Sequence, residues 1–270
     1  MMTKSYRLGT ALTAVSLAAL AAGCAGPASR SASALGSKVD ASNIGLATRA
    51  QLALAQNDVA GAVPLAERAV ETSPQDAGFR ALLANCYLAA GRIASAEAAY
   101  RDSLSLLASQ PQVILKLALV QIAQGKKGEA RQLLAESQSL LDPSDTGLAL
   151  ALAGDPQTAV SLLEQVARST AGDARTRQNL ALAHALAGDW TRARIVASQD
   201  LPGDQLDARI EQWMALANPA RASDQVAAFI GIQPAAADPG QPTRLALSQG
   251  DTVREAARLA ARMARDGMVA

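Results

Sequence analysis

Pairs of small residues return along this chain at a nearly constant spacing. The first member of each pair is Gly or Asn, and an alanine follows five residues later. The pairs are Asn57 and Ala62, Gly91 and Ala96, Gly125 and Ala130, Gly154 and Ala159, and Gly188 and Ala193. Successive first members lie 34, 34, 29 and 34 residues apart. A period of about 34 residues is typical of helix-turn-helix repeats, whose units stack because no single unit can bury its apolar face alone.

Composition favours an all-α protein. Half of the 270 residues are hydrophobic, but only 3% are aromatic. The abundant Ala and Leu are strong helix formers, whereas strands favour β-branched and aromatic residues. The 25 basic and 24 acidic residues nearly cancel, so no strong net charge attracts nucleic acid. We therefore expect a helical repeat protein with no nucleic-acid partner.

The recurring positions in this spacing have physical reasons. Glycine can end a helix in the left-handed conformation without steric cost, and Asn57 tolerates the same turn. The alanine then lies early in the second helix, where the two helices approach closely. The unit with the clearest pattern carries Leu83-Ala84-x-x-Tyr87 and Ala96-x-x-x-Tyr100. This pattern resembles the tetratricopeptide repeat (TPR).

The TPR resemblance implies a right-handed solenoid of about five units, and the regular glycine breaks exclude a stand-alone coiled coil. The expected units span 44–74, 78–108, 112–142, 145–171 and 174–201. The fourth unit is about five residues short. Capping helices are expected over 202–230, a mobile Pro/Ala-rich linker over 231–250 and a basic amphipathic helix over 251–270. That last helix is either simply solvated or suited to a partner or anionic lipid headgroups.

The N-terminus has the pattern of a secretory signal. Lys4 and Arg7 precede an apolar run, which ends in Leu20-Ala21-Ala22-Gly23-Cys24. This ending resembles the lipobox of bacterial lipoproteins, with Ala21 where Leu is usual. The resemblance implies a signal peptide over 1–23, acylation (palmitate) of Cys24 and a flexible tether over 24–43. Ala25 favours the outer membrane, at its periplasmic face. The alternative is an ordinary signal peptide with an incidental cysteine.

The sequence offers little for catalysis. His184 is the sole histidine, and Cys86 is the sole cysteine besides Cys24. Such a set cannot form an ordinary zinc site, and no nucleophile elbow or phosphate-binding loop is present. We expect no enzyme activity, no cofactor, no metal and no small-molecule substrate.

Protein binding is the function that the TPR resemblance implies instead. In that family the first helix of each unit lines a concave groove. The groove residues expected on this basis are Gln51, Leu54, Asn85, Leu88, Leu115, Leu119, Ile122, Gln178 and Leu182. They are mostly apolar with scattered amides, which favours a helix or an extended apolar segment as the ligand.

One stretch points to a narrower family. Residues 175–194, together with the lipobox and about five repeats, resemble the TadD-type lipoprotein of the tight-adherence (Tad/Flp) pilus. This resemblance covers roughly residues 1–230. It implies a pilotin-like or scaffolding adaptor that helps the pilus secretin to localise or assemble. The alternatives are an adaptor for peptidoglycan hydrolases or another envelope machine and, more weakly, an enzyme accessory or solute-binding protein.

Overall fold

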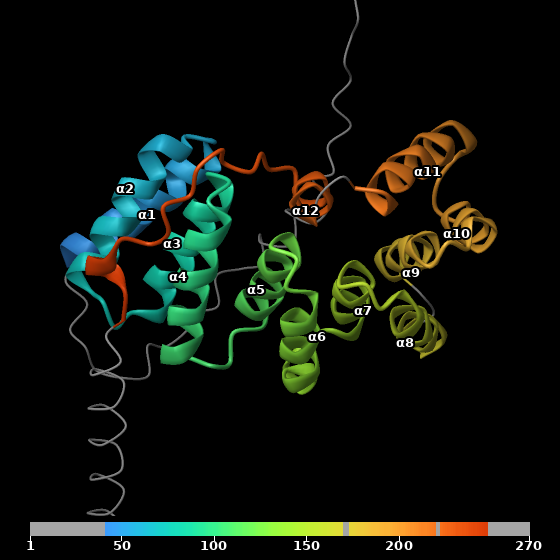
Figure 1. Ribbon diagram of the computed structural model, residues 1–270, viewed down its shortest axis with the longest axis horizontal. Coiled ribbons are helices and arrows are strands. Elements are labelled where there is room, and N and C mark those ends of the chain that lie inside the picture. Colours follow the sequence, from blue (N-terminus) through green and yellow to red (C-terminus); the bar gives the residue numbers. More distant parts are fainter. Residues whose placement is uncertain (1–40, 170–172, 220–221, 248–270) are drawn as a thin grey trace, which may run out of the picture. The chain divides into compact units, whose positions relative to one another are not determined.

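The computed structural model describes residues 41–169, 173–219 and 222–247 (Figure 1). Within these ranges the regular structure is helical and contains no strand, which confirms the all-α prediction. None of the described helices combines the length and the apolar character that a membrane span needs. The expected signal peptide, the Cys24 lipidation site, most of the tether and the basic helix over 251–270 lie outside the described residues.

Helices α1–α10 form five consecutive pairs. Each helix packs on its partner in the pair. The bounds are α1 Ala41–Ala55 with α2 Val59–Thr72, α3 Ala77–Ala89 with α4 Ile93–Leu106, α5 Pro111–Ala123 with α6 Lys127–Glu136, α7 Pro143–Leu152 with α8 Pro156–Ser169, and α9 Ala174–Leu186 with α10 Trp190–Ala197. In the fourth pair α7 has 10 residues, three fewer than α5 or α9.

The turn inside each pair has the same backbone geometry. The φ angles are positive at Asn57 (59°), Gly91 (70°), Gly125 (76°), Gly154 (81°) and Gly188 (84°). In every turn the next residue donates its N–H to the carbonyl four residues before the Gly or Asn, at 2.8–3.0 Å. This bond satisfies a carbonyl that the helix end leaves unpaired, as in a Schellman cap.

Small residues let the two helices of a pair approach each other. The five alanines of the sequence pattern have no solvent exposure: Ala62, Ala96, Ala130, Ala159 and Ala193. A second buried series lies seven residues before each turn: Ala50, Ala84, Ala118, Gly147 and Ala181. Larger side chains then fill the remaining space, and Tyr87 and Tyr100 are fully buried in the second pair. The pairs thus share one continuous apolar core.

Two further helices follow the fifth pair. Helix α11 (Gly203–Ala217) packs on α9 and α10 through buried residues that include Ile210 and Trp213. Helix α12 (Ala222–Ile230) contacts α11 and, more extensively, α5. Of the last two described α-helices, α11 therefore lies against the fifth pair and α12 against the third.

Residues 231–247, which we call the strap, differ from the mobile linker that the sequence predicts. Figure 1 shows them running from α12 back to the first two pairs. The Ala235 N–H donates to Gly91 O at 3.0 Å, and Leu245, in the short 3-10 helix η3 (Thr243–Leu245), is 2% exposed. Proline and glycine prevent the strap from forming a long helix, but its other side chains can still contact the repeats. The segment is consequently irregular and docked.

Candidate partner-binding surfaces

The predicted groove residues lie on the first helices of their pairs, but they differ in accessibility. Gln51 is exposed. Six others are half-buried: Leu54, Asn85, Leu88, Leu115, Leu119 and Gln178. Ile122 and Leu182 are 0% and 5% exposed, so the structure places them in the core, out of reach of a ligand.

Asn85 is engaged within the chain. Its side-chain oxygen accepts from Tyr100 Oη and from Lys116 Nζ, each at 2.8 Å. The amide thus connects α3 to α4 and to α5. Because this oxygen already has two partners, Asn85 contributes mainly to packing of the second pair against the third.

Helix α12 covers part of the layer of first helices. It packs on α5, the helix that carries Leu115 and Leu119. The sequence predicts capping helices here from the fading of the repeat pattern, but that fading does not say where a cap will dock. The groove residues of α1 remain the more accessible part of the predicted surface.

A cleft opens beside the shortened fourth unit. It has a volume of about 490 Å³ and lies between α6, α7 and α8. Its lining combines apolar side chains such as Leu134, Leu150 and Leu162 with the charged residues Arg131 and Asp155. The short α7 leaves less surface to pack on α6. Sequence analysis found the shortened unit but not the cleft, since no single residue type marks it.

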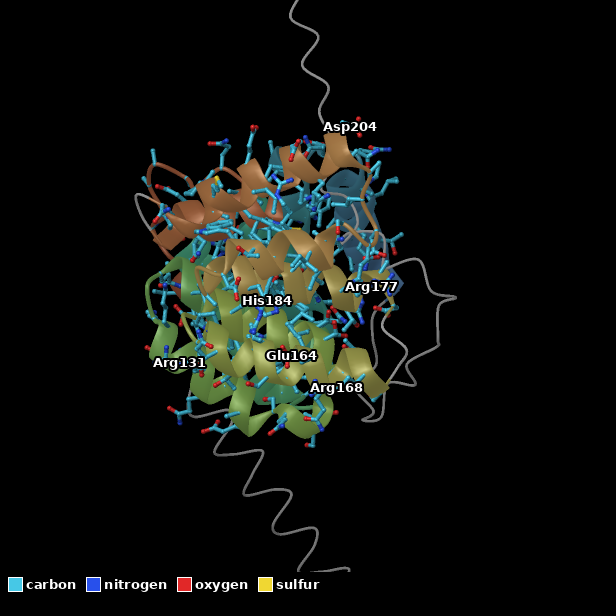
Figure 2. All side chains as sticks on the ribbon, turned by 90° about the vertical axis from the view of Figure 1, so that its right-hand side faces the viewer. Arg131, Glu164, Arg168, Arg177, His184 and Asp204 are labelled. Carbon is cyan, nitrogen blue, oxygen red and sulfur yellow. The ribbon has the colours of Figure 1, made fainter. Side chains whose placement is uncertain are left out.

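The two residues with potential chemistry are buried. His184 on α9 is 4% exposed, and burial lowers its pKa against the opposing effects of Asp189 and Glu164. Figure 2 shows His184 among the stacked helices near Glu164. Cys86 is fully buried, and burial raises the pKa of its thiol to about 12. A buried thiol of this kind is a poor nucleophile at neutral pH because little thiolate forms.

The part of the chain that the structure describes contains no group of three or more His, Cys, Asp or Glu residues arranged to hold a metal ion. Several of the described carboxylates cap helices. Asp58, Asp76 and Asp173 each accept from a backbone N–H in the first turn of the helix that follows. These are N-caps, which satisfy donors that a helix start leaves unpaired.

Two segments match profiles of the tetratricopeptide repeat. They are residues 53–105, from the end of α1 almost to the end of α4, and residues 144–201, from the first turn of α7 to the end of the fifth unit. No curated protein matches the chain in sequence.

The chain is also similar to solved structures. A structure from the functional characterisation of Pseudomonas aeruginosa pilF is 19% identical, with a TM-score of 0.51, and the match covers 72% of this chain and 90% of that one. YrrB, described as a TPR protein with an unusual peptide-binding site, is 18% identical with a TM-score of 0.48, covering 63% of this chain and 92% of that one. The regular structure of the described residues is therefore helical, and residues 53–105 and 144–201 match the tetratricopeptide repeat, which typically mediates protein–protein interaction.

Proposed function

We propose that this protein is a lipid-anchored, non-enzymatic adaptor that binds another protein in the bacterial envelope. The observation that carries the binding role is the stack of repeats itself. Five pairs of helices present successive side chains along one layer, so a partner can contact several units at once. Folds of this type provide extended surfaces rather than enclosed reaction sites.

The proposed location follows from the N-terminal sequence. Acyl chains on Cys24 would hold the protein firmly, since stable anchoring needs more than one membrane-binding element. The structure places residues 41–43 of the predicted tether in α1. The remaining residues, 24–40, would leave the repeats free to meet a partner near the periplasmic face of the outer membrane.

The proposed partner is the secretin of a Tad/Flp pilus. Residues 175–194 carry the specific resemblance. They include all of α9 except its first residue, the turn that follows, and α10 as far as Arg194. Some of their charges have structural partners: Arg175 pairs with Asp145 at 2.5 Å, and Arg177 pairs with Asp200. Ile195, next in sequence, is 58% exposed, which supports α10 as a surface with contact area left for a partner.

A deletion strain tests this proposal. We expect loss of surface pili and fewer secretin multimers in outer-membrane fractions, both restored by the wild-type gene. Cys24→Ser should fail to restore them and should leave the membrane fraction without lipid label. Cys86→Ala is the matched control, because it removes the other thiol from a buried site and should keep the lipid.

Normal piliation in the deletion strain would exclude the pilus role. If that strain instead forms chains or lyses, the adaptor would act on peptidoglycan hydrolases. If Cys24→Ser remained lipid-labelled, the proposed anchor would be wrong.

A further inference from the structure

Arg80 lies at the centre of the surface of α2, α3 and α4 on which the strap docks. It comes from α3, and it is only 1% exposed. Its guanidinium donates to Pro74 O at 2.7 Å, to Asp102 Oδ2 at 2.7 Å and to Leu245 O at 2.8 Å. The first two partners belong to the repeats, whereas Leu245 belongs to the strap. A main-chain carbonyl of the strap therefore completes the coordination of a buried cation.

An aspartate of the strap occupies an anion-binding position at the start of α4. The Asp238 carboxylate accepts from Ser95 N at 3.0 Å and from Ser95 Oγ at 2.5 Å. The guanidinium of Arg92 lies 3.7 Å away, and it also donates to Gly240 O at 3.1 Å. Free N–H groups in the first turn of a helix favour an anion, and a nearby arginine strengthens that preference.

Near its C-terminal end the strap carries a positive charge that pairs with acidic residues of the repeats. Arg244 pairs with Glu71 at 2.5 Å and with Glu67 at 3.1 Å, both on α2. The neighbouring Leu245 is 2% exposed and belongs to the main apolar core. An arginine followed by a leucine thus docks where two glutamates of α2 lie beside the apolar core.

The side chains that contact the strap are also held by contacts within the repeats. Tyr87 Oη donates to Glu67 at 2.7 Å, and Arg92 lies over the Tyr87 ring at 4.3 Å from its centre. With the bonds from Arg80 to Pro74 and Asp102, these contacts orient the binding groups before any ligand arrives. Such preorganisation reduces the entropy that binding costs.

These contacts are those of an extended peptide in a binding site. Main-chain groups of Ala235, Gly240 and Leu245 bond to the repeats, while a carboxylate, a guanidinium and a leucine enter three different positions. Main-chain bonds provide affinity, and side-chain positions provide selectivity.

We propose that the surface formed by Glu67, Glu71, Arg80, Arg92, Ser95 and Asp102, here called the docking surface, is a peptide-binding site that the strap occupies as an intramolecular ligand. The partner that it fits is an extended protein segment with an aspartate followed six and seven residues later by arginine and leucine. The existence of such a partner rests on the proposed adaptor function. Since a tethered ligand acts at an effective concentration of about millimolar, the strap sets a threshold that a partner must exceed.

The test uses the full chain with two substitutions in the strap alone, Asp238→Asn and Arg244→Gln. This variant keeps every residue of the docking surface but weakens binding of the strap to it. A fluorescent peptide of residues 234–247 should bind it at least tenfold more tightly than it binds the wild type. The same peptide carrying the two substitutions should bind at least tenfold more weakly. Adding Glu71→Gln to the variant should lower affinity for the unmodified peptide but not for the substituted one.

Hydrogen exchange of residues 234–247 serves as the second readout, and it should become faster in the variant. Unchanged exchange would overturn the role of these contacts in holding the strap. Faster exchange without binding of the peptide would overturn the binding site. Neither measurement depends on pili or on lipidation, so failure here is distinguishable from failure of the proposed envelope function.

Discussion

At the scale of single residues, close helix packing depends on two series of small side chains. One series is the alanines five residues after each turn, and the other lies seven residues before it. In the fourth unit the second series holds Gly147. A Cβ atom at Gly147 would lie 2.5 Å from Leu163 Cγ, and Leu163 is fully buried. The tight contact explains glycine at a helical position where alanine has the higher propensity.

Gly147→Ala should therefore destabilise the protein. Overpacking against Leu163 should lower the free energy of unfolding by about 1–3 kcal/mol, more than the propensity gain of alanine offsets. Gly128→Ala on α6 is the matched control, because a Cβ there meets nothing within 4 Å. Urea unfolding followed by circular dichroism measures both. Equal stability of the two variants would contradict the proposed close contact.

The buried thiol gives a second prediction at this scale. In a Cys24→Ser chain, iodoacetamide at pH 8 should modify Cys86 only in molecules that unfold, because burial raises the pKa of the native thiol to about 12. The unfolded thiol has a pKa of about 8.5, so it ionises first as pH rises. This group's contribution to stability is thus intact below about pH 8.5 and is lost as pH rises toward 12. Rapid labelling of folded protein, measured by mass spectrometry, would contradict the burial of Cys86.

The sequence reveals residues that recur and misses residues that pair at long range. Gly91 and Ala96 are visible because the same spacing returns in other units. Arg80 and Leu245 are 165 residues apart in sequence, and nothing local indicates that one carbonyl will meet one guanidinium. Ile122 and Leu182 fall on the helices expected for the groove, but their burial depends on packing between helices, which the spacing does not describe.

At the scale of elements, the repeat pairs follow from local signals, while the strap and α12 do not. A turn residue and its alanine fix each pair within about 34 residues. Residues 231–247 instead dock on partners more than a hundred residues earlier. Their proline and glycine content excludes regular structure, but it says nothing about contacts made by Asp238 or Arg244. Composition alone therefore predicts a linker where the structure has a docked strap.

Gly91 connects the turn of the second unit to the strap. A Cβ at this position would lie 2.0 Å from Gln233 O and 2.6 Å from Ala235 N. Gly91→Ala should therefore release the strap, which faster hydrogen exchange over residues 234–247 would reveal. Gly125→Ala is the matched control: it has a similar positive φ, but its Cβ meets nothing within 4 Å. It should cost about 1–2 kcal/mol from backbone strain and leave the strap docked. Equal exchange in both variants would contradict this contact.

Docking of the strap should also depend on pH. Burial alone would raise the pKa of Asp238, but hydrogen bonds from Ser95 and from the backbone of Gly240 and Ala94 outweigh it and lower the pKa. A lowered pKa stabilises docking above the unfolded value of about 3.9, and that stability is lost as pH falls through the folded value. Amide exchange of residues 234–247, corrected for intrinsic rates, should rise relative to α9 on acidification. Asp238→Asn should remove most of this dependence.

At the scale of the whole molecule, the chain departs from a simple linear array. In such an array each unit contacts only its neighbours, so a change at one end is felt locally. Here α11 packs on α9 and α10, α12 packs on α5, and the strap reaches α2 and α4. These contacts connect the fifth unit to the first two without passing through all the units between them.

Ile210→Ala on α11 tests this coupling. Ile210 is 5% exposed, so the substitution should cost about 2–5 kcal/mol where α11 packs. If α11, α12 and the strap act together, hydrogen exchange should also rise at residues 234–247. Met214→Ala on the same helix is the matched control. Because Met214 is 48% exposed, this substitution should change the free energy of unfolding by no more than about 0.5 kcal/mol. Faster exchange confined to α9, α10 and α11 would instead mean that destabilising α11 affects only the helices that it contacts in the fifth unit. The strap would then be held by the docking surface alone, and a competing peptide could displace it without changing the packing of α11 and α12.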